Sequence, residues 1–474
     1  MTRDPLWTDK TAADATGGET TEAFESDGVA FDSREVTDRD LFVALKGEQT
    51  DGHNYVNQAF EKGASAAMVE RRPDDLAPAS PLLLVVDTTN GLNDLARAAR
   101  ARTKARVAAV TGSVGKTGTK EALHHVLGLQ GLTHVSEKSF NNHVGTPLSL
   151  ARMPQATAFG VFEVGMNQPG EIAPLATLVR PHVALVTTVE AVHAANFDSE
   201  VGIADEKACI FDGLQEGGVA VINGDNRHAN ALVARAEASP AGTIVRFGSS
   251  EDCDHRLLAW SDTDHGGAVS ALIAGERVDY KLSLAGQHQA LNSVAVLAVV
   301  HHLSGDVAKA AADLEGLQPM AGRGARHNVR VAGGSVTVLD ESYNASPVAL
   351  RAALTVLSQT QTGPGGRRIA VLGDMLELGD DAVALHTGLS GDLIQHKVDL
   401  LFAVGPMMNR LYGELPPARR GGAAGNARAM ADLLGDVLRP GDVILIKGSR
   451  RIGLEAVVEA LTQGRPGGTS ARGG

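Results

Sequence analysis

Cysteine is almost absent from this chain. Only Cys209 and Cys253 occur among 474 residues, so a disulfide framework cannot stabilise the fold, and the composition fits a reducing compartment. Aromatic residues make up only 4% of the chain, whereas glycine accounts for 54 residues. We therefore expect cores built from alanine, valine and leucine, with many turns between the regular elements.

Long apolar runs are also missing. No stretch approaches the ~18 apolar residues that a membrane-spanning helix requires, and the N-terminus has no apolar segment of signal-peptide length. No block of basic residues occurs, and the formal net charge is −13, which argues against nucleic acid or an anionic membrane as the main partner. We predict a cytoplasmic protein with no membrane span and no nucleic-acid partner.

Length and the order of apolar segments predict three domains. Residues 1–104 form the first, a small α/β domain, and its polar residues 1–25 are expected to be partly disordered. Residues 105–320 alternate strand and helix, which is typical of a parallel sheet covered by helices on both faces. Residues 321–474 form a third α/β domain, and its Gly-rich end, 465–474, is expected to be a flexible tail.

The segment from Arg106 to Leu127 carries the strongest chemical signal. A short apolar run, Val107–Val110, predicts a buried strand, and a glycine-rich turn then leads into Lys116-Thr117 and an apolar-periodic helix. This order is typical of a phosphate-binding loop, in which backbone N–H groups and a lysine hold the anion and the hydroxyl can bind Mg²⁺. Its form is shorter than usual, because Val110 stands where a first glycine is expected. The alternative is a strand–helix turn that contains glycine and lysine by coincidence.

Three further residues follow the phosphate loop at positions suited to a metal site. Glu163 ends a predicted strand, where a Mg²⁺ ligand is wanted, although a solvated carboxylate is an equal alternative. His193 follows another predicted strand, but a lone histidine is more often structural and Mg²⁺ prefers oxygen ligands. Lys207 lies on a predicted helix, where a lysine is ordinarily part of a solvated face.

Polar residues near the third domain suit a nucleotide. Asn292 lies one helical turn from His288, on the same side of a predicted helix. Arg323 falls between the second and third domains, where a guanidinium can clamp a phosphate across a cleft. Asp340 and Asn344 follow a predicted strand, and the carboxylate is placed to hold a ribose hydroxyl.

These segments, taken in order, resemble the Mur ligase family. The resemblance rests on TGSVGKT, NNHVGTPL, LDESYNASP, LGDMLELG and IKGSR, and it extends from about Asp32 to Arg450. It implies a domain for a UDP-sugar, a central ATPase and a Rossmann-like C-terminal domain. It also implies an ATP- and Mg²⁺-dependent amide ligase that proceeds through an acyl phosphate. Within the family the motifs are most similar to the branch that joins D-alanyl-D-alanine to UDP-N-acetylmuramoyl-tripeptide (UDP-MurNAc-tripeptide), and we expect a monomer.

The resemblance also assigns roles to individual residues. Lys116, Lys207, His193 and Arg323 match catalytic positions, and Lys207 matches a lysine that is carbamylated in the family. The nucleotide contacts match Gly112, Ser113, Val114, Gly115, Lys116, Thr117, Gly118, Asn292, Arg323, Asp340 and Asn344. The metal positions match Thr117, Glu163, Lys207 and His193. The substrate positions match Ser33, Arg34, Lys46, Asp51, His53, Asn141, Asn142 and Thr146.

Several positions depart from the family pattern. Gly118 stands where threonine or serine is usual and costs the helix about 1 kcal/mol in propensity. Thr187-Thr188 replaces an Asn-containing pair, Cys209 replaces a common glutamate, Glu341 replaces aspartate and Ser346 replaces asparagine. None of these changes removes a group with an assigned catalytic role.

Two alternatives remain open at the level of the sequence. One is another amide ligase of the same superfamily, of the tripeptide-forming or the folylpolyglutamate type. The tripeptide-forming enzyme shares the DSR and DGH segments at 32–34 and 51–53 but lacks LGDMLELG. The other is a nucleotide-binding module without catalysis, which the intact Lys116, Glu163 and Lys207 argue against.

Overall fold

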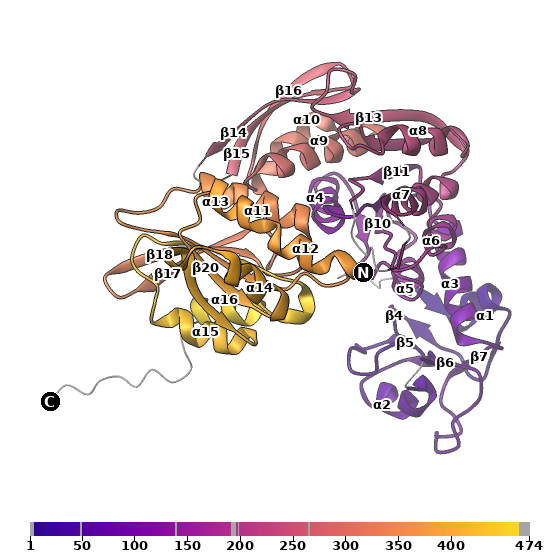
Figure 1. The fold of residues 1–474 in the computed structure, drawn as a ribbon. Helices are drawn as coiled ribbons and strands as arrows, with labels where there is room; N and C mark the ends of the chain where they lie inside the picture. Colours follow the sequence, from indigo (N-terminus) through magenta and orange to yellow (C-terminus); the bar gives the residue numbers. More distant parts are fainter. Residues whose placement is uncertain are drawn as a thin grey trace.

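The computed structural model describes residues 4–47, 50–137, 140–190, 196–197, 199–263 and 266–463. Figure 1 shows three sheet-containing units in chain order, the first in indigo and violet, the last in orange and yellow. The three-domain α/β architecture expected from the sequence is confirmed. Among the described residues, no helix has the length and apolar character needed to cross a membrane.

The first unit is a five-stranded sheet in the order β2-β7-β6-β5-β4. Neighbouring strands are parallel except for β2 and β7, and β1 pairs antiparallel with β3 in a separate small sheet. The helices and strands of this unit are β1 Trp7–Thr8, α1 Asp9–Thr16, β2 Glu19–Thr20, β3 Glu25–Ser26, β4 Gly28–Ala30, β5 Asp40–Val43, η1 Gly52–Tyr55, α2 Val56–Glu61, β6 Ala66–Val69, β7 Leu82–Leu84 and α3 Thr88–Arg102.

The expectation of partial disorder in residues 1–25 is wrong from residue 4 onward. Trp7 is only 1% exposed, its indole N–H donates to Ala151 O at 2.9 Å, and Arg102 stacks on its ring at 4.1 Å. Thr8 then caps α1 through a capping box with Thr11. One buried aromatic anchor and a helix cap thus order a stretch whose composition is polar. Residues 464–474, with the expected tail, lie outside the described residues.

The central unit contains a nine-stranded sheet in the order β16-β15-β14-β13-β12-β11-β8-β10-β9. Pairing is parallel from β9 to β14, as expected from the sequence, whereas β14, β15 and β16 form an antiparallel meander. Its elements are β8 Arg106–Thr111, α4 Lys116–Gly128, β9 Thr133–Val135, α5 Gly145–Ala151, β10 Phe159–Glu163, α6 Ile172–Val179, β11 Val183–Val186, α7 Glu200–Ala208, η3 Cys209–Gly213, β12 Gly218–Asn223, α8 Ala229–Glu237, β13 Ala241–Gly248, β14 His255–Thr263, β15 Gly266–Ile273, β16 Glu276–Leu282, α9 Gln287–His302, α10 Val307–Asp313 and η4 Leu314–Gly316.

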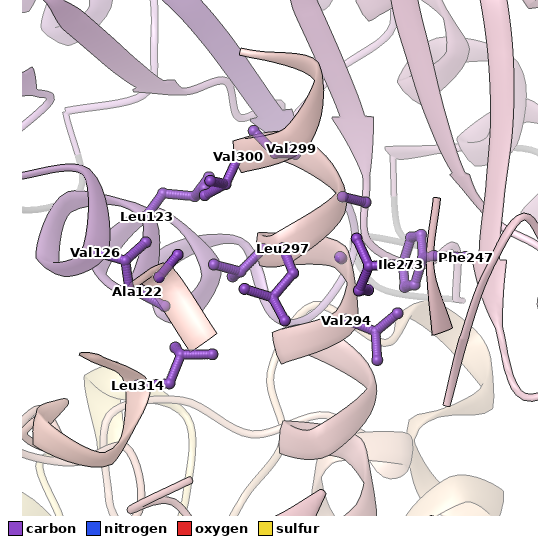
Figure 2. Close-up of a cluster of buried hydrophobic side chains, with 14 of the residues drawn as sticks. Ala122, Leu123, Val126, Phe247, Ile273, Val294, Leu297, Val299, Val300 and Leu314 are labelled. Atoms are coloured by element: carbon purple, nitrogen blue, oxygen red, sulfur yellow. The ribbon is translucent and has the colours of Figure 1, made fainter. Parts of the chain in front are cut away.

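Two apolar clusters cover the two faces of this central sheet. On one face α4 and α9 pack together, and Figure 2 shows Leu123 and Val126 of α4 beside Leu297 and Val300 of α9. On the other face the cluster includes residues of α6, α7 and α8. Burial on both faces explains why β8 and β11 read as continuous apolar runs in the sequence.

The third unit has a six-stranded sheet in the order β17-β18-β22-β19-β20-β21, parallel except for the hairpin of β17 and β18. Helices lie on both faces of this sheet, as the apolar clusters of the unit show. Its elements are β17 Ala325–Val331, β18 Gly334–Glu341, α11 Pro347–Gln359, β19 Arg368–Gly373, η5 Gly379–Asp381, α12 Ala382–Thr387, α13 Leu389–Gln395, β20 Leu400–Val404, α14 Pro406–Glu414, η6 Pro417–Arg419, β21 Arg420–Ala424, α15 Ala427–Gly435, β22 Val443–Lys447, η7 Arg450–Ile452 and α16 Glu455–Thr462.

A cluster of three histidines joins the meander to the end of α9. His255 is 2% exposed, its Nδ1 accepts from Ala274 N at 3.2 Å, and its Nε2 lies 3.3 Å from His302 Nε2. The His301 ring packs against both other imidazoles. Burial, reinforced by His302 and His301, lowers the pKa of His255 to about 4, while Asp254 opposes the shift. The pKa of His302 is lowered by burial and by the charge of His301. His255 and His302 are therefore neutral at neutral pH.

We predict that this cluster makes the fold acid-sensitive. Because the folded pKa of His255 lies below its ordinary value of 6.5, the unfolded chain binds a proton first as the pH falls. Stability is full above about pH 6.5 and is lost toward pH 4, by about 3 kcal/mol at most. Denaturant unfolding at several pH values measures this loss. His255→Asn, which keeps an acceptor for Ala274 N, should flatten the profile, whereas His396→Asn, outside the cluster, should leave it unchanged. An equally steep profile for both variants would contradict the assignment.

Candidate active site

The phosphate loop connects β8 to α4 through two glycines with positive φ. Gly112 has φ 146° and Gly115, the residue before α4, has φ 91°. A Cβ at Gly112 would collide with Thr187 Oγ1, and one at Gly115 would lie 3.2 Å from Asn292 Nδ2. Both positions therefore require glycine for backbone conformation and for space. Gly118, by contrast, has open space where a Cβ would lie, so nothing in the structure explains the absence of a side chain there.

Lys116 is the cation of this loop. Its Nζ donates to Gly112 O at 2.6 Å, so the side chain folds back over the turn. Burial lowers its pKa, Glu163 counteracts this effect, and Arg323 adds to it. Two cations, Lys116 and Arg323, thus approach the same point from different domains. A bound polyanion such as a nucleotide triphosphate would stabilise both charges.

Glu163 lies at the end of β10 and is held from two sides. Its Oε2 accepts from Thr117 Oγ1 at 2.8 Å, and its Oε1 accepts from Asn141 Nδ2 at 2.7 Å. The residue is 2% exposed, so its carboxylate is fixed in place by the helix start and the polar loop. A hydroxyl and a carboxylate oxygen at this distance are the donors that Mg²⁺ prefers. Thr117 and Glu163 therefore fit the predicted magnesium site.

The remaining predicted metal residues do not complete a cluster in the described structure. Among the described residues, no group of three or more His, Cys, Asp and Glu side chains is arranged to hold a metal ion. His193 lies outside the described residues. Lys207, on α7, is 2% exposed, and no hydrogen bond or ion pair of its amine occurs within the described part of the chain. Burial and the nearby charge of Lys116 lower the pKa of Lys207 well below its ordinary value. Lys207 is therefore not part of a solvated helix face, which is the usual position of a lysine on a helix.

The phosphate loop opens into a cavity of about 460 Å³ between the central and third units. Its lining includes twelve of the predicted residues, namely Ser113, Val114, Gly115, Lys116, Thr117, Gly118, Asn141, Asn142, Glu163, Asn292, Arg323 and Asn344. The Arg323 guanidinium stacks on the Tyr343 ring at 3.8 Å, and its Nε is buried without a hydrogen-bond partner among the described residues. A buried guanidinium donor at a cavity wall is suited to an acceptor on a bound anion, such as a phosphate oxygen.

The third unit supplies a second side of this cavity. Lys447, at the end of β22, donates to Asn344 O at 3.0 Å and pairs with Glu341 Oε2 at 3.3 Å. Glu341, which departs from the family pattern, thus still provides a carboxylate partner. Ser346 caps α11 by accepting from Ala349 N, a role that asparagine performs equally well. These two departures therefore preserve the local structure.

Asp340 does not line the cavity, and its contact with ribose stays a prediction. It is 3% exposed and accepts hydrogen bonds from Gly322 N, Ser342 N and Ser342 Oγ at 2.7, 3.1 and 2.6 Å. These bonds hold the turn that carries Arg323. Asp340 thereby fixes the backbone next to Arg323, and the sequence could not show this because Gly322 lies in a turn 18 residues earlier in the chain.

The predicted substrate residues of the first unit lie apart from this cavity. None of Ser33, Arg34, Lys46, Asp51 and His53 lines it. His53 is 5% exposed and bridges two elements, since Nδ1 contacts Asp51 Oδ1 at 2.6 Å and Nε2 accepts from Glu70 N at 2.9 Å. Ser33 donates to Gln58 at 2.7 Å, and exposed Arg34 pairs with Asp32 at 2.7 Å. In the described structure His53 and Asp51 therefore stabilise their own domain.

The two other loop residues have different positions. Asn142 accepts from Gly145 N at 2.9 Å, which holds the start of α5, and it also lines the cavity. Thr146 is fully buried, and its Oγ1 has no hydrogen-bond partner among the described residues. It does not line the cavity.

The residues that follow β11 support the phosphate loop, and the sequence analysis did not identify this role. Thr187 Oγ1 donates to Val114 O at 2.6 Å, and Ser113 N donates to Thr188 O at 2.8 Å. Behind them, Asn223 Nδ2 donates to Thr187 O at 2.8 Å, and Asn226 Nδ2 donates to Thr188 Oγ1 at 2.9 Å. The only available signal was the position of the Thr-Thr pair just after a buried strand. Thr187 therefore positions the loop that faces the phosphates.

Comparison with known proteins agrees with this geometry. Family models described as the Mur ligase family catalytic domain, the Mur ligase middle domain and the Mur ligase glutamate ligase domain match residues 25–102, 110–300 and 325–450. The UDP-N-acetylmuramoyl-tripeptide--D-alanyl-D-alanine ligase of Bacillus subtilis is 33% identical over 447 residues, which cover 92% of this chain and 93% of that protein. This chain belongs to the Mur ligase family.

Solved structures of Mur ligases share the whole architecture. MurF from Acinetobacter baumannii aligns with a TM-score of 0.85 and 28% identity over 97% of this chain and 99% of that chain. MurF from Thermotoga maritima, solved in complex with ADP, aligns with a TM-score of 0.75 and 27% identity over 92% of this chain and 96% of that chain. The cavity described above therefore lies within a Mur ligase fold.

We predict that Thr187→Val weakens nucleotide binding without unfolding the protein. The substitution keeps the shape of the side chain but leaves Val114 O without its donor, at a cost of about 1 kcal/mol. The KM for the nucleotide should rise about fivefold, with a smaller change in kcat. Thr187→Ser, which keeps the hydroxyl, should restore the wild-type KM. If Thr187→Ser and Thr187→Val behave alike in steady-state kinetics, the hydroxyl has no positioning role.

Proposed function

We propose that this chain is an ATP-dependent ligase that joins D-alanyl-D-alanine to UDP-MurNAc-tripeptide, giving UDP-MurNAc-pentapeptide for peptidoglycan synthesis. The observation that carries the proposal is one cavity in which Lys116, Thr117 and Glu163 of the central unit face Arg323 of the following segment. The choice of D-alanyl-D-alanine as acceptor and of the UDP-linked tripeptide as substrate rests on the names of relatives that align with nearly all of this chain.

The chemistry follows from the groups at the cavity. A carboxylate is a poor electrophile, so amide formation requires activation by transfer of the γ-phosphate, which gives an acyl phosphate. Lys116 and Arg323 offset the charge that develops on the transferred group. The amine of the dipeptide then attacks the acyl carbon, and phosphate leaves from the tetrahedral intermediate. Because the cavity lies between two units, their approach also excludes water from the acyl phosphate.

The proposal includes Mg²⁺, held by Thr117 and Glu163. The metal would neutralise negative charge on the nucleotide phosphates. The chain's own contribution is to fix these two oxygen groups: Asn141 orients Glu163 by a hydrogen bond of 2.7 Å, and the start of α4 carries Thr117. These residues hold the ligand groups in place before the nucleotide binds.

Lys207 fits a carbamylated lysine. A neutral amine adds to CO₂, forming an N–C bond and releasing one proton, and the product is a carboxylate-like group that suits Mg²⁺. Burial and the charge of Lys116 both favour the neutral amine at Lys207. Carbamylation would therefore convert the buried amine of Lys207 into a group that offers oxygen ligands.

Two other ligases of the superfamily remain as alternatives with a shared fold. A solved 2,6-diaminopimelate ligase and a folylpolyglutamate synthase align with TM-scores of 0.52 and 0.63 at 16% and 18% identity. Likeness at this level shows the fold alone. The dipeptide-adding activity is favoured because relatives of that name match this chain at 30–33% identity over more than nine tenths of its length.

We predict that phosphate release depends on both proposed substrates. Released phosphate should be substantial only with UDP-MurNAc-tripeptide, D-alanyl-D-alanine, ATP and Mg²⁺ together, since the acyl phosphate must be shielded until the amine arrives. Removing Mg²⁺ with a chelator should abolish release. D-alanine, a diamino acid and glutamate should be poor acceptors. Lys116→Ala, with an intact fold by circular dichroism, provides the inactive control. Faster turnover with UDP-MurNAc-dipeptide and a diamino acid, or with a folate, would refute the assignment.

We predict that Lys207→Ala lowers kcat at least ~100-fold, because it removes a proposed ligand of the metal ion. Short carboxylates such as formate should restore part of the lost activity. The physical reason is that the added anion supplies the oxygen ligand removed with the carbamate. Enzyme equilibrated with ¹³C-bicarbonate should show a carbamate carbon signal that Lys207→Ala lacks. Lys309→Ala, an exposed lysine on α10, serves as the matched control and should keep both activity and signal. An active wild-type enzyme without that signal would disprove carbamylation.

A further inference from the structure

A second cavity, of about 540 Å³, lies between α3 and α6, and it shares no lining residue with the nucleotide cavity. One wall is the face of α3 that carries Arg97 and Arg100, and the other is formed by α6 and the residue that caps its end, Arg180. His143, from the loop before α5, completes the lining. Since α3 follows the first sheet and α6 belongs to the central unit, the groove joins two units of the fold.

The charged lining of this groove consists of cations and one histidine. Three arginines and His143 reach it, and no aspartate or glutamate lines it. This is a marked local excess of positive charge in a chain whose net charge is −13. Arg97 pairs with Asp94 of its own helix at 2.5 Å, but Asp94 does not line the groove. The groove therefore concentrates positive charge without a counter-ion in its lining.

Arg100 is fixed at the base of the groove. It is 3% exposed, Nε donates to Val179 O at 2.8 Å, and Nη2 donates to Arg180 O at 2.8 Å. Burial, and then the neighbouring charge of Arg180, lower the pKa of Arg100 to about 10. The guanidiniums of Arg100 and Arg180 thus repel each other, and burial of Arg100 limits the screening of this repulsion by water. A bound anion would relieve this repulsion.

Arg180 is available to a ligand. It caps α6 in the left-handed region at φ 46°, and its side chain makes no hydrogen bond or ion pair within the described ranges. Leu175 and Leu178 of α6 form an apolar surface beside it and are 5% and 9% exposed. Cationic donors and an apolar surface in one groove match a molecule with an anionic group and an apolar part.

We propose that this groove binds a phosphate-bearing organic anion, with the phosphate between Arg97, Arg180 and His143 and the apolar part on Leu175 and Leu178. Arginine suits this ligand because its planar fork donates two parallel hydrogen bonds to a phosphate. Such a ligand would contact α3 and α6 together and would link the first unit to the central one. The site shares no residue with the nucleotide cavity, so its test does not depend on the proposed ligation.

The test is calorimetric titration with inorganic pyrophosphate. The phosphate loop is expected to bind this probe as well, so the titration is done in Lys116→Ala, where that binding is removed. One site should remain. Arg180→Ala and Arg97→Ala, each added to Lys116→Ala, should weaken it at least ~tenfold, because each removes a charged donor to phosphate from the groove. Arg410→Ala, an exposed arginine on α14 that does not line the groove, is the matched control and should leave the affinity unchanged.

A competition experiment distinguishes two ligands that could place a phosphate in the groove, namely the UDP-linked substrate and a separate phosphorylated molecule. If UDP-MurNAc-tripeptide displaces pyrophosphate from Lys116→Ala, and Arg180→Ala weakens both, the groove holds the phosphate of the UDP-linked substrate. If both bind together, the groove holds a separate phosphorylated ligand. The proposal is overturned if Lys116→Ala binds no pyrophosphate, or if the two arginine variants bind it as tightly as the control. If the wild-type enzyme does not ligate the two substrates although Lys116→Ala binds pyrophosphate as expected, only the proposed function is contradicted.

Discussion

Parallel pairing of β8 with β10 and β11 is the constraint on which the nucleotide site depends. The register places Val110 opposite Glu163 and Thr111 opposite Val186. The carboxyl ends of three strands therefore meet at one edge, so the phosphate loop, the Glu163 carboxylate and the supporting Thr187 become neighbours without any being close in sequence. A slip of one residue in β10 would move Glu163 to the opposite face of the sheet and separate it from Thr117.

The third unit contributes to the nucleotide cavity with the carboxyl ends of two of its own strands. β18 and β22 pair in parallel, with Glu341 opposite Lys447, and both residues line the nucleotide cavity. Asp340, one residue earlier, secures the turn that presents Arg323. Arg323, which lines the nucleotide cavity, is thus held by a sheet outside the phosphate loop. Under the proposed function, a movement of the third unit relative to the central one would also change the distance between Arg323 and the phosphate loop.

The sequence predicted the elements better than the roles of single side chains. The predicted strand Val107–Val110 lies within β8, Arg106–Thr111, because a parallel strand that is buried on both faces leaves a continuous apolar run. The phosphate loop and Glu163 were predictable because the motif and the strand end are local. The order of the N-terminus was not, since it depends on Trp7 reaching Ala151 across 144 residues. The structural roles of Asp340, His53 and Thr187 likewise depend on partners that no local pattern reveals.

Lys116 and Lys207 lie in environments that favour different charge states of the same residue type. Lys116 retains a nearby carboxylate, Glu163, and faces a cavity, so its charge has a partner and a substrate to bind. Lys207 is almost fully buried, and the charge of Lys116 acts on it directly. Charging both amines in so little water would be unfavourable, and the cost is least when Lys207 is neutral. The charge of Lys116 thereby adds to burial in favouring the neutral amine at Lys207, which is the state that the proposed carbamylation requires.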